Sequence, residues 1–263
     1  MWSPDATLRT CAVIVTVWAA CGCGSQQAAS TTPTPVPTST GDPLPARPRV
    51  LMLTATVGFR HDAIATAVSS MRTLAGAGDL TVTHTEDLSS LSPATLAAQD
   101  VVMFALTSGE LALTPEQKTA LVEFVMRGGG FIGIHSATDT LYEWPDYGRL
   151  VGAYFKEHPW TQLATVVVED AAHPATAGVP GSFAIREEFY TFRDNPRGRV
   201  HVLLRLDAAS VGASGDYPLA WVQEVGQGRA YYNALGHFSE TWTDQRFQRQ
   251  VAGAVRWAAN LNR

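Results

Sequence analysis

Apolar residues in the first half of the chain gather in short uniform runs, and each run ends in a polar loop. Such runs predict strands that are covered on both faces, because a strand with one wet face alternates apolar and polar residues. After the first run, residues from Asp62 to about Leu74 space their apolar side chains at helical intervals. Alternating strands and helices predict a parallel sheet with right-handed crossovers. The predicted strands are Arg49–Ala55, Leu80–His84, Asp100–Leu106 and Phe131–His135.

A second predicted helix has a clear start and a clear end in the sequence. Thr114 precedes Pro115, and Gln117 stands at the third position after the threonine. A threonine N-cap, a proline in the first turn and a glutamine at that spacing together favour a capping box. The glycines at 128–130 are expected to end the helix, since glycine adopts the left-handed backbone of a C-terminal cap.

The second half of the chain is less regular and predicts strands that are joined partly by hairpins. Glycines at 226 and 228 favour a tight hairpin between the last two strands, and a closing helix is expected from Asp244 to about Asn260. The predicted fold class is therefore α/β, with a mostly parallel sheet flanked by helices and extra antiparallel strands in the C-terminal half. The predicted strands here are Leu163–Glu169, Val200–Asp207, Leu219–Val225 and Arg229–Ala234.

The first 48 residues predict export and a tether. Residues 1–20 contain an apolar run of signal-peptide length and end in small residues before Cys21. This ending predicts a lipoprotein anchored to the cell membrane through acylated Cys21, with Cys23 as a second candidate and a secreted protein as the alternative. Residues 21–48 are rich in serine, threonine and proline, which predicts a disordered linker. The folded domain is then expected at residues 49–263.

Composition narrows the chemistry of that domain. All three cysteines lie within the first 23 residues, so the domain has no thiol for a disulfide or a covalent catalyst. Apolar residues make up 46% of the 263 residues, which is enough for a sizeable core. The formal net charge of −5 provides no basic face for phosphates. Nucleic acid is therefore not expected as a partner.

Polar residues at the ends of the predicted strands are the candidates for chemistry, because parallel α/β sheets bind ligands beyond the carboxyl ends of their strands. His135 ends an apolar strand, and we expect it to open into a pocket as a catalytic base or metal ligand, with a core histidine as the alternative. Asp139 follows it, either to orient His135 or to cap a helix. The loop after the first strand adds Arg60 and His61 as substrate-binding candidates and Asp62 as a helix cap.

Short motifs in series along residues 49–260 resemble the ThuA-like family, which is named for a trehalose-utilisation protein. The similarity is densest at residues 128–140 (GGGFIGIHSATDT) and 187–192 (EEFYTF), and it continues through Leu235-Gly236-His237. The resemblance implies a fold similar to class I glutamine amidotransferases, whose catalytic cysteine stands on a sharp strand-to-helix elbow. His135 occupies the elbow position here, so glutaminase chemistry through a thioester is not available.

The acidic-aromatic motif of the same family adds further site candidates. Adjacent Glu187 and Glu188 on an extended segment point to opposite faces, and the resemblance favours Glu188 for the site. His237 ends a predicted strand, in a place comparable to that of the amidotransferase histidine. With His135 these two residues form the predicted catalytic group, and they also suit Zn²⁺ or another divalent metal. Further candidates for substrate contact are Asp139, Tyr190, Trp144 and His158.

Two functions are implied by the resemblance and stay open at this point. The first is an enzyme that acts on sugars or oxidised sugar derivatives by hydrolysis, isomerisation or elimination, with or without metal assistance. The second is a non-catalytic module that binds a carbohydrate or another cell-envelope ligand, with aromatic rings as stacking surfaces. The partner expected in both cases is a small carbohydrate, and fold alone does not decide between them.

Overall fold

The computed structural model describes residues 47–260, which contain one nine-stranded sheet. The strand order is β2-β1-β3-β4-β9-β8-β7-β5-β6. Cys21, Cys23 and the segments predicted as signal peptide and linker lie outside the described residues. Within residues 47–260, no helix combines the length and the apolar character needed to cross a membrane.

One half of the sheet is parallel, and its inner strands are buried on both faces. β1 (Arg49–Leu53), β3 (Val101–Ala105) and β4 (Gly130–Ile134) are almost wholly buried. β2 (Thr81–Thr85) is the edge strand, and β9 (Gly228–Asn233) pairs in parallel with β4. The strands predicted from uniform apolar runs are confirmed here to within two residues at each end.

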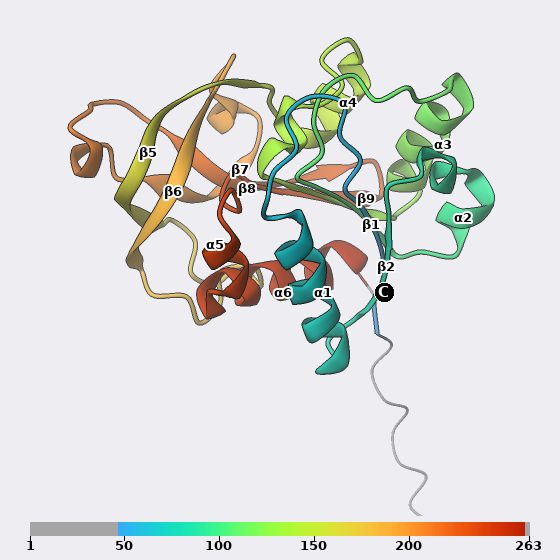
Figure 1. Cartoon of the computed structure of the whole chain (residues 1–263), viewed down its shortest axis with the longest axis horizontal. Helices are drawn as coiled ribbons and strands as arrows, with labels where there is room; N and C mark the ends of the chain where they lie inside the picture. Colours follow the sequence, from blue (N-terminus) through green and yellow to red (C-terminus); the bar gives the residue numbers. More distant parts are fainter. Residues whose placement is uncertain (1–46, 261–263) are drawn as a thin grey trace, which may run out of the picture. The chain divides into compact units, whose positions relative to one another are not determined.

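One face of the sheet is covered by α1 (Ile64–Gly76), α5 (Ser239–Thr243) and α6 (Gln245–Ala259), which contact one another in the lower part of Figure 1. The buried side of α6 packs against β4 and β9. No side chain caps α1, and Ala63 stands at its N-cap position. The expectation that Asp62 caps this helix is therefore wrong.

The other face is covered by α2 (Pro93–Ala97), α3 (Pro115–Met126) and α4 (Pro145–Val151). The capping box predicted for α3 is confirmed. The Thr114 hydroxyl accepts a hydrogen bond from the Gln117 amide, and the Gln117 side chain accepts one from the Thr114 amide. This reciprocal pair satisfies two of the amides that the start of a helix leaves without an intrahelical partner.

The other half of the sheet is antiparallel and is dominated by one long hairpin. β5 (Phe155–Val168) and β6 (Ser182–Phe192) form the hairpin, and β7 (His201–Leu206) and β8 (Pro218–Val225) connect it to β9. Register shifts interrupt the pairing of β5 near Glu157. The sheet is thus parallel over one half rather than mostly parallel. β5 begins well before its predicted start, and the sequence pattern does not predict β6.

The loops that follow the parallel strands meet at the carboxyl edge of the sheet, as this topology requires. Isolated bridges join Thr56 to Ser108 and Gly109 to Thr140, so the loops after β1, β3 and β4 are bound to one another. This edge therefore offers fixed loop ends for a site. Short 3-10 helices occupy further turns of the described chain: η1 (Leu88–Leu91), η2 (His135–Asp139), η3 (Pro196–Gly198) and η4 (Ala208–Val211).

Candidate metal centre

His135 lies where β4 turns into η2, and its backbone is strained there. Its φ of +52° falls in the left-handed region, which is uncommon for a residue other than glycine. The sharp strand-to-helix turn implied by the resemblance is therefore present, with an imidazole at its tip. The expectation that His135 opens into a pocket is wrong. Its side chain is 0% exposed, because the rings of Tyr190, His61 and His237 pack against it.

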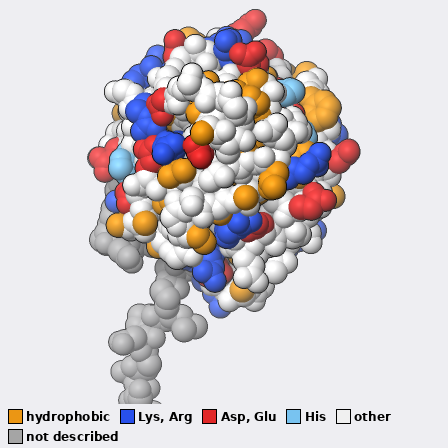
Figure 2. Space-filling model, turned by 90° about the vertical axis from the view of Figure 1, so that its left-hand side faces the viewer, with side chains coloured by type: hydrophobic (Ala, Val, Ile, Leu, Met, Phe, Trp, Pro, Cys, Tyr) orange, Lys and Arg blue, Asp and Glu red, His pale blue; other side chains and the backbone are white. Residues whose placement is uncertain are grey.

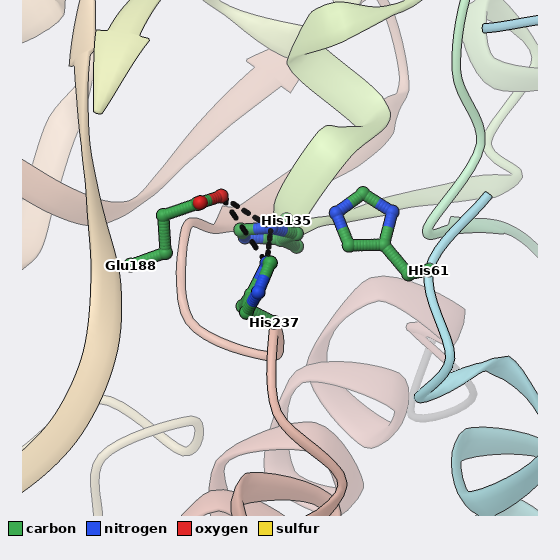
Figure 3. Close-up of side chains that lie close together, drawn as sticks. All are labelled: His61, His135, Glu188 and His237. Carbon is green, nitrogen blue, oxygen red and sulfur yellow. Dashed lines mark hydrogen bonds and ion pairs between the residues drawn. The ribbon is translucent and has the colours of Figure 1, made fainter. Parts of the chain in front are cut away.

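Three side chains from distant parts of the chain join His135. His61 comes from the loop after β1, Glu188 from β6 and His237 from the loop after β9 (Figure 3). One ligand atom of each of the four residues lies within 4.8 Å of the others. Nε2 of His135 is 3.2 Å from Nδ1 of His237, and Oε2 of Glu188 is 3.5 and 3.2 Å from these two nitrogens. The structure thus brings together the three residues proposed as metal ligands and adds His61 to them.

The ring of His135 is oriented by a backbone carbonyl. Its Nδ1 lies 2.7 Å from the carbonyl oxygen of Ala234, at the end of β9, so the Nδ1–H group donates to that oxygen. In the neutral ring, Nε2 then carries the lone pair and faces the cluster, as in metal-binding histidines generally. Asp139, expected to orient His135 or to cap a helix, does neither. Its carboxylate accepts a hydrogen bond from the Tyr142 hydroxyl at 2.6 Å, and Trp144 is the N-cap of the next helix.

Glu187, the residue before Glu188, holds the His237 loop in place. It is fully buried, and its carboxylate accepts hydrogen bonds from the amides of Gly236 (2.8 Å) and His237 (3.3 Å) and from the hydroxyl of Thr241. A buried carboxylate is costly unless donors surround it, so these contacts fix both the carboxylate and the loop. The two glutamates face opposite sides of β6, as expected. This positioning role of Glu187 was not predicted from the sequence.

Glu188 carries the negative charge of the cluster. Burial would raise the pKa of Glu188, but the adjacent imidazoles of His135 and His237 together outweigh burial and hold that pKa well below its ordinary value. Burial would likewise lower the pKa of His237, but the adjacent Glu188 carboxylate outweighs burial and raises it. Glu188 is therefore an ionised carboxylate at neutral pH, and it is the anionic member of the cluster.

His61 differs from His237 in its electrostatics. Its side chain is only 5% exposed, and burial, together with His135 and His237, lowers its pKa to about 3. Its ring meets those of His135 and His237 edge-on, with centroids 4.8 and 5.2 Å apart. Its Nδ1 is buried and has no hydrogen-bond partner within residues 47–260. A neutral imidazole beside an ionised carboxylate suits a metal ligand better than the substrate-binding role expected from the sequence.

Two further sequence candidates border the ligand atoms. The hydroxyl of Tyr190 lies 3.0 Å from Nε2 of His135, and burial raises the pKa of this tyrosine well above its ordinary value. His158 is half-exposed, and its Nδ1 is 3.3 Å from Oε1 of Glu188. Since Oε2 of the same carboxylate faces His135 and His237, His158 contacts the outer side of Glu188.

The remaining candidates, Arg60 and Trp144, have other partners. Arg60 precedes His61 and forms an ion pair with Glu86 at 2.8 Å. Trp144 is buried at the start of α4 and stacks on Tyr147, with ring centroids 5.9 Å apart. Its indole belongs to the core, so it does not offer the open face on which a sugar would stack.

The donor set of the cluster suits a divalent transition metal. Three imidazole nitrogens and one carboxylate oxygen, with no thiolate among the described residues, are common ligands of Zn²⁺ and of manganese, iron and nickel ions. The carbonyl behind His135 and the Glu187 contacts supply the outer hydrogen bonds that orient metal ligands. Nδ1 of His61 has no hydrogen-bond partner among the described residues, so a cation can bind there without displacing one. The residues present therefore fit such an ion.

Fold and cluster together define an α/β protein with a candidate three-histidine, one-carboxylate metal centre at the carboxyl edge of its sheet. The chain belongs to the ThuA family, because the family model described as trehalose utilisation matches residues 49–258. The structure is similar to that of a putative ThuA-like protein from Bacteroides uniformis, with a TM-score of 0.68 and 23% identity over 83% of this chain and 94% of that one.

Two other solved structures show the same fold at lower identity. A putative ThuA-like protein from Parabacteroides merdae has a TM-score of 0.68 and 19% identity, covering 82% of this chain and 91% of that one. A putative GMP synthase component from Thermoplasma acidophilum has a TM-score of 0.52 and 10% identity, covering 82% and 96%. No curated protein matches the chain. The resemblance to the ThuA-like family is confirmed, and these structural likenesses concern the fold alone.

Proposed function

We propose that the domain binds one divalent metal ion through His61, His135, Glu188 and His237 and acts on sugars or oxidised sugar derivatives. The observation that carries the proposal is the convergence of four ligand atoms within 4.8 Å from four separate segments. The family description, trehalose utilisation, supports a carbohydrate substrate. The composition of the first 48 residues supports export and a Cys21 anchor as part of the same proposal.

The coordination number of the ion separates a structural role from a catalytic one. Four protein ligands close a tetrahedral zinc site, whereas a six-coordinate ion keeps positions free for a substrate. The side chains of Glu188 and His237 are 12% and 21% exposed, so the cluster is reached from their side. This access favours an ion with free positions, and such an ion, when bound, polarises a substrate oxygen or lowers the pKa of a water molecule.

Neighbouring residues of the chain are placed to move and hold protons. His158 is half-exposed beside the outer oxygen of Glu188, where its imidazole can accept a proton from a substrate and return it. The buried hydroxyl of Tyr190 stays protonated because its pKa is raised, so it can donate a hydrogen bond to Nε2 of His135 and hold that ring in place. Hydrolysis, isomerisation and elimination all need a proton-transfer group of this kind beside the reacting carbon.

The proposal excludes glutaminase chemistry, although an amidotransferase-like fold is part of it. The parallel order β2-β1-β3-β4-β9 corresponds to that of flavodoxin-like sheets, and the likeness to a GMP synthase component supports the same relationship. All three cysteines precede residue 24, and His135 occupies the elbow. An imidazole at that place can coordinate an ion but cannot form the thioester.

Metal content tests the proposal directly. The purified protein is stripped with a chelator, offered Zn²⁺, Mn²⁺, Fe²⁺, Co²⁺ or Ni²⁺ in turn, and analysed by elemental mass spectrometry. We expect about one ion per chain in the wild type and loss of the ion in His135→Ala and in His237→Ala. His201→Ala is the matched control, because His201 pairs with Asp170 outside the cluster.

Turnover then separates the enzyme from the binding module. The metal-loaded protein is incubated with neutral sugars and with their keto and acid derivatives, and products are followed by NMR. Product formation that is lost in His135→Ala supports the enzyme, whereas sugar binding without any product supports the non-catalytic module. A wild-type protein that takes up none of the five ions, or full ion content in both histidine variants, would contradict the metal centre.

A further inference from the structure

A cavity of about 590 Å³ opens beside the cluster, next to the carboxyl ends of β1 and β2. His61 forms part of its lining, so the cavity and the candidate metal centre share a residue. Two larger cavities, of about 650 and 770 Å³, are lined by none of the four cluster residues. The position and size of the cavity suit a small ligand that lies beside His61.

An ion pair forms part of the polar lining of this cavity. Nη2 of Arg60 donates to Oε1 of Glu86 at 2.8 Å, and Nη1 donates to Oε2 at 3.1 Å. Oγ1 of Thr54 lies 3.4 Å from Oε1 of Glu86 and 2.8 Å from Nε2 of His84, which ties the carboxylate to the sheet. The Arg60 and Glu86 side chains are 54% and 43% exposed. Since a guanidinium has five N–H donors and a carboxylate about four acceptor sites, the pair keeps both kinds of group free for a ligand.

The other polar groups of the lining balance in charge. Arg72 and Asp62 add one charge of each sign to the Arg60–Glu86 pair. Burial lowers the pKa of His84 against the opposing effect of Glu86, so this imidazole is neutral at pH 7. A set of donors and acceptors without net charge matches hydroxyl groups, each of which both donates and accepts. A carboxylate or phosphate would meet Asp62 and Glu86 as well as the two arginines.

Another part of the lining is apolar. Ile64, Ala65 and Val68 belong to the first turns of α1 and contribute to the cavity. A pyranose presents C–H groups on its faces and hydroxyl groups around its rim. A cavity with one apolar part and one part rich in donors and acceptors therefore matches such a ring.

We propose that this cavity binds the ring of an uncharged, hydroxyl-rich substrate, with the Arg60–Glu86 pair contacting two adjacent hydroxyl groups. The ring then lies next to His61, one of the four candidate metal ligands. The inference rests on the proposed function and deepens it, because it gives the substrate class as a neutral sugar. It also assigns Glu86, which the sequence analysis did not single out, as a binding residue.

Binding of defined sugars tests the inference. Methyl β-glucoside and trehalose serve as neutral probes, and glucuronate and glucose 6-phosphate carry a similar ring with an anionic group. Each is titrated into the metal-loaded protein by calorimetry. We expect the neutral probes to bind, and Glu86→Gln to weaken them about tenfold or more, because a charged acceptor is lost. Glu123→Gln is the matched control, since Glu123 pairs with Arg127 outside this cavity.

Metal content is measured in every variant, which keeps this test separate from that of the metal centre. The Arg60–Glu86 pair is exposed, so Glu86→Gln is expected to fold and to retain its ion. Failure of both neutral probes to bind, or unchanged affinity in Glu86→Gln, would overturn the inference while leaving the metal result intact. If glucuronate or glucose 6-phosphate binds more tightly than the neutral probes, and Arg72→Ala weakens that binding, the inference of a neutral sugar is overturned in favour of an acidic substrate.

Discussion

The parallel and antiparallel halves of the sheet contribute to the candidate metal centre in different ways. In the parallel half, His61 lies in the loop after β1 and His135 directly follows β4, so topology alone brings them to one edge. In the antiparallel half, Glu188 lies within β6, the last strand in the sheet order. The long β5–β6 hairpin carries it to the cluster, and register shifts between Phe155 and Trp160 mark irregular pairing in β5. Three of the four ligands, His61, His135 and His237, follow parallel strands and are placed by topology, whereas Glu188 depends on how one hairpin packs.

The hydrophobic core, unlike the candidate metal centre, is common to both halves of the sheet. Large apolar side chains are mostly buried in the common core of both halves, and exposed ones such as Val57 and Phe59 are exceptions. One face of the molecule accordingly shows scattered apolar side chains among charged ones in Figure 2. The core holds the halves together without selecting the position of any ligand, so the polar contacts between the halves must do so.

Glu187 provides the polar contact that links the two halves most directly. It extends from β6 to the amides of Gly236 and His237 in the loop after β9, the strand that both halves share. If the cluster depends on contacts between the two halves, loss of the Glu187 carboxylate should lower stability and metal affinity more than a substitution confined to one half.

Glu187→Ala is therefore expected to have the largest effect. The substitution leaves the amides of Gly236, His237 and Glu188 and the Thr241 hydroxyl without their acceptor, so the free energy of unfolding should fall by about 3 kcal/mol in urea unfolding. Release of the His237 loop should also weaken metal affinity about 10- to 100-fold.

The control for this variant is Glu240→Ala, which removes an exposed glutamate from the neighbouring α5. It should change stability by less than about 0.5 kcal/mol. Glu187→Gln keeps one acceptor oxygen and should lie between the two. Equal stability of Glu187→Ala and Glu240→Ala would show that the contact between the halves is not needed.

Glu187 also shows why β6 could not be predicted from the sequence. Phe183, Ile185 and Phe189 alternate on the buried face of the strand, and Glu187 occupies the same face between them. A carboxylate at an inward position breaks the apolar alternation on which strand prediction depends. The same interruption is the signal that could have identified it, because a carboxylate among buried positions must find donors.

The parallel half could be predicted because its signals are local. Uniform apolar runs predict its strands, and the end of one such run made His135 a candidate, whereas Glu188 in the other half was chosen through the family resemblance. His61 was expected to bind substrate, because it lies in the loop that leads from the first strand into a helix. No two of the four ligands are close enough in the sequence to form a local metal motif. Its place among them depends on the path of the loop after β1, which periodicity does not determine.

The pH dependence of stability should distinguish His61, whose pKa is lowered, from His237, whose pKa is raised. The folded-state pKa of His61 is lowered from 6.5 to about 3, so between these values the unfolded chain binds a proton that the folded chain does not. His61 therefore stabilises the fold fully above pH 6.5, and this contribution is lost as pH falls. For the chelator-treated protein, the difference should amount to about 1–2 kcal/mol between pH 6.5 and 5.

His61→Gln removes the titrating group and gives the comparison. The pKa values of His84 and His173 are also lowered, but both residues are common to wild type and variant. The pKa of His237 is raised, so its stabilising effect is present at acid pH and is lost as pH rises above about 6.5. His237 therefore adds little to the change in stability between pH 6.5 and 5. Urea unfolding at several pH values should give a shallower slope for His61→Gln. Parallel slopes would mean that His61 is not kept neutral by burial.

Thr114→Ala should have the smallest effect, because it removes a signal that is local to the parallel half. The Thr114 hydroxyl caps α3 and is exposed, so its loss should lower the free energy of unfolding by about 1 kcal/mol. Thr119→Ala, in the same helix but without a capping bond, should be neutral or slightly stabilising, since alanine is the better helix former. Metal content should equal that of the wild type in both variants, because α3 supplies no ligand. If Thr114→Ala lost its ion as Glu187→Ala should, the centre would depend on overall stability rather than on the contact between the two halves.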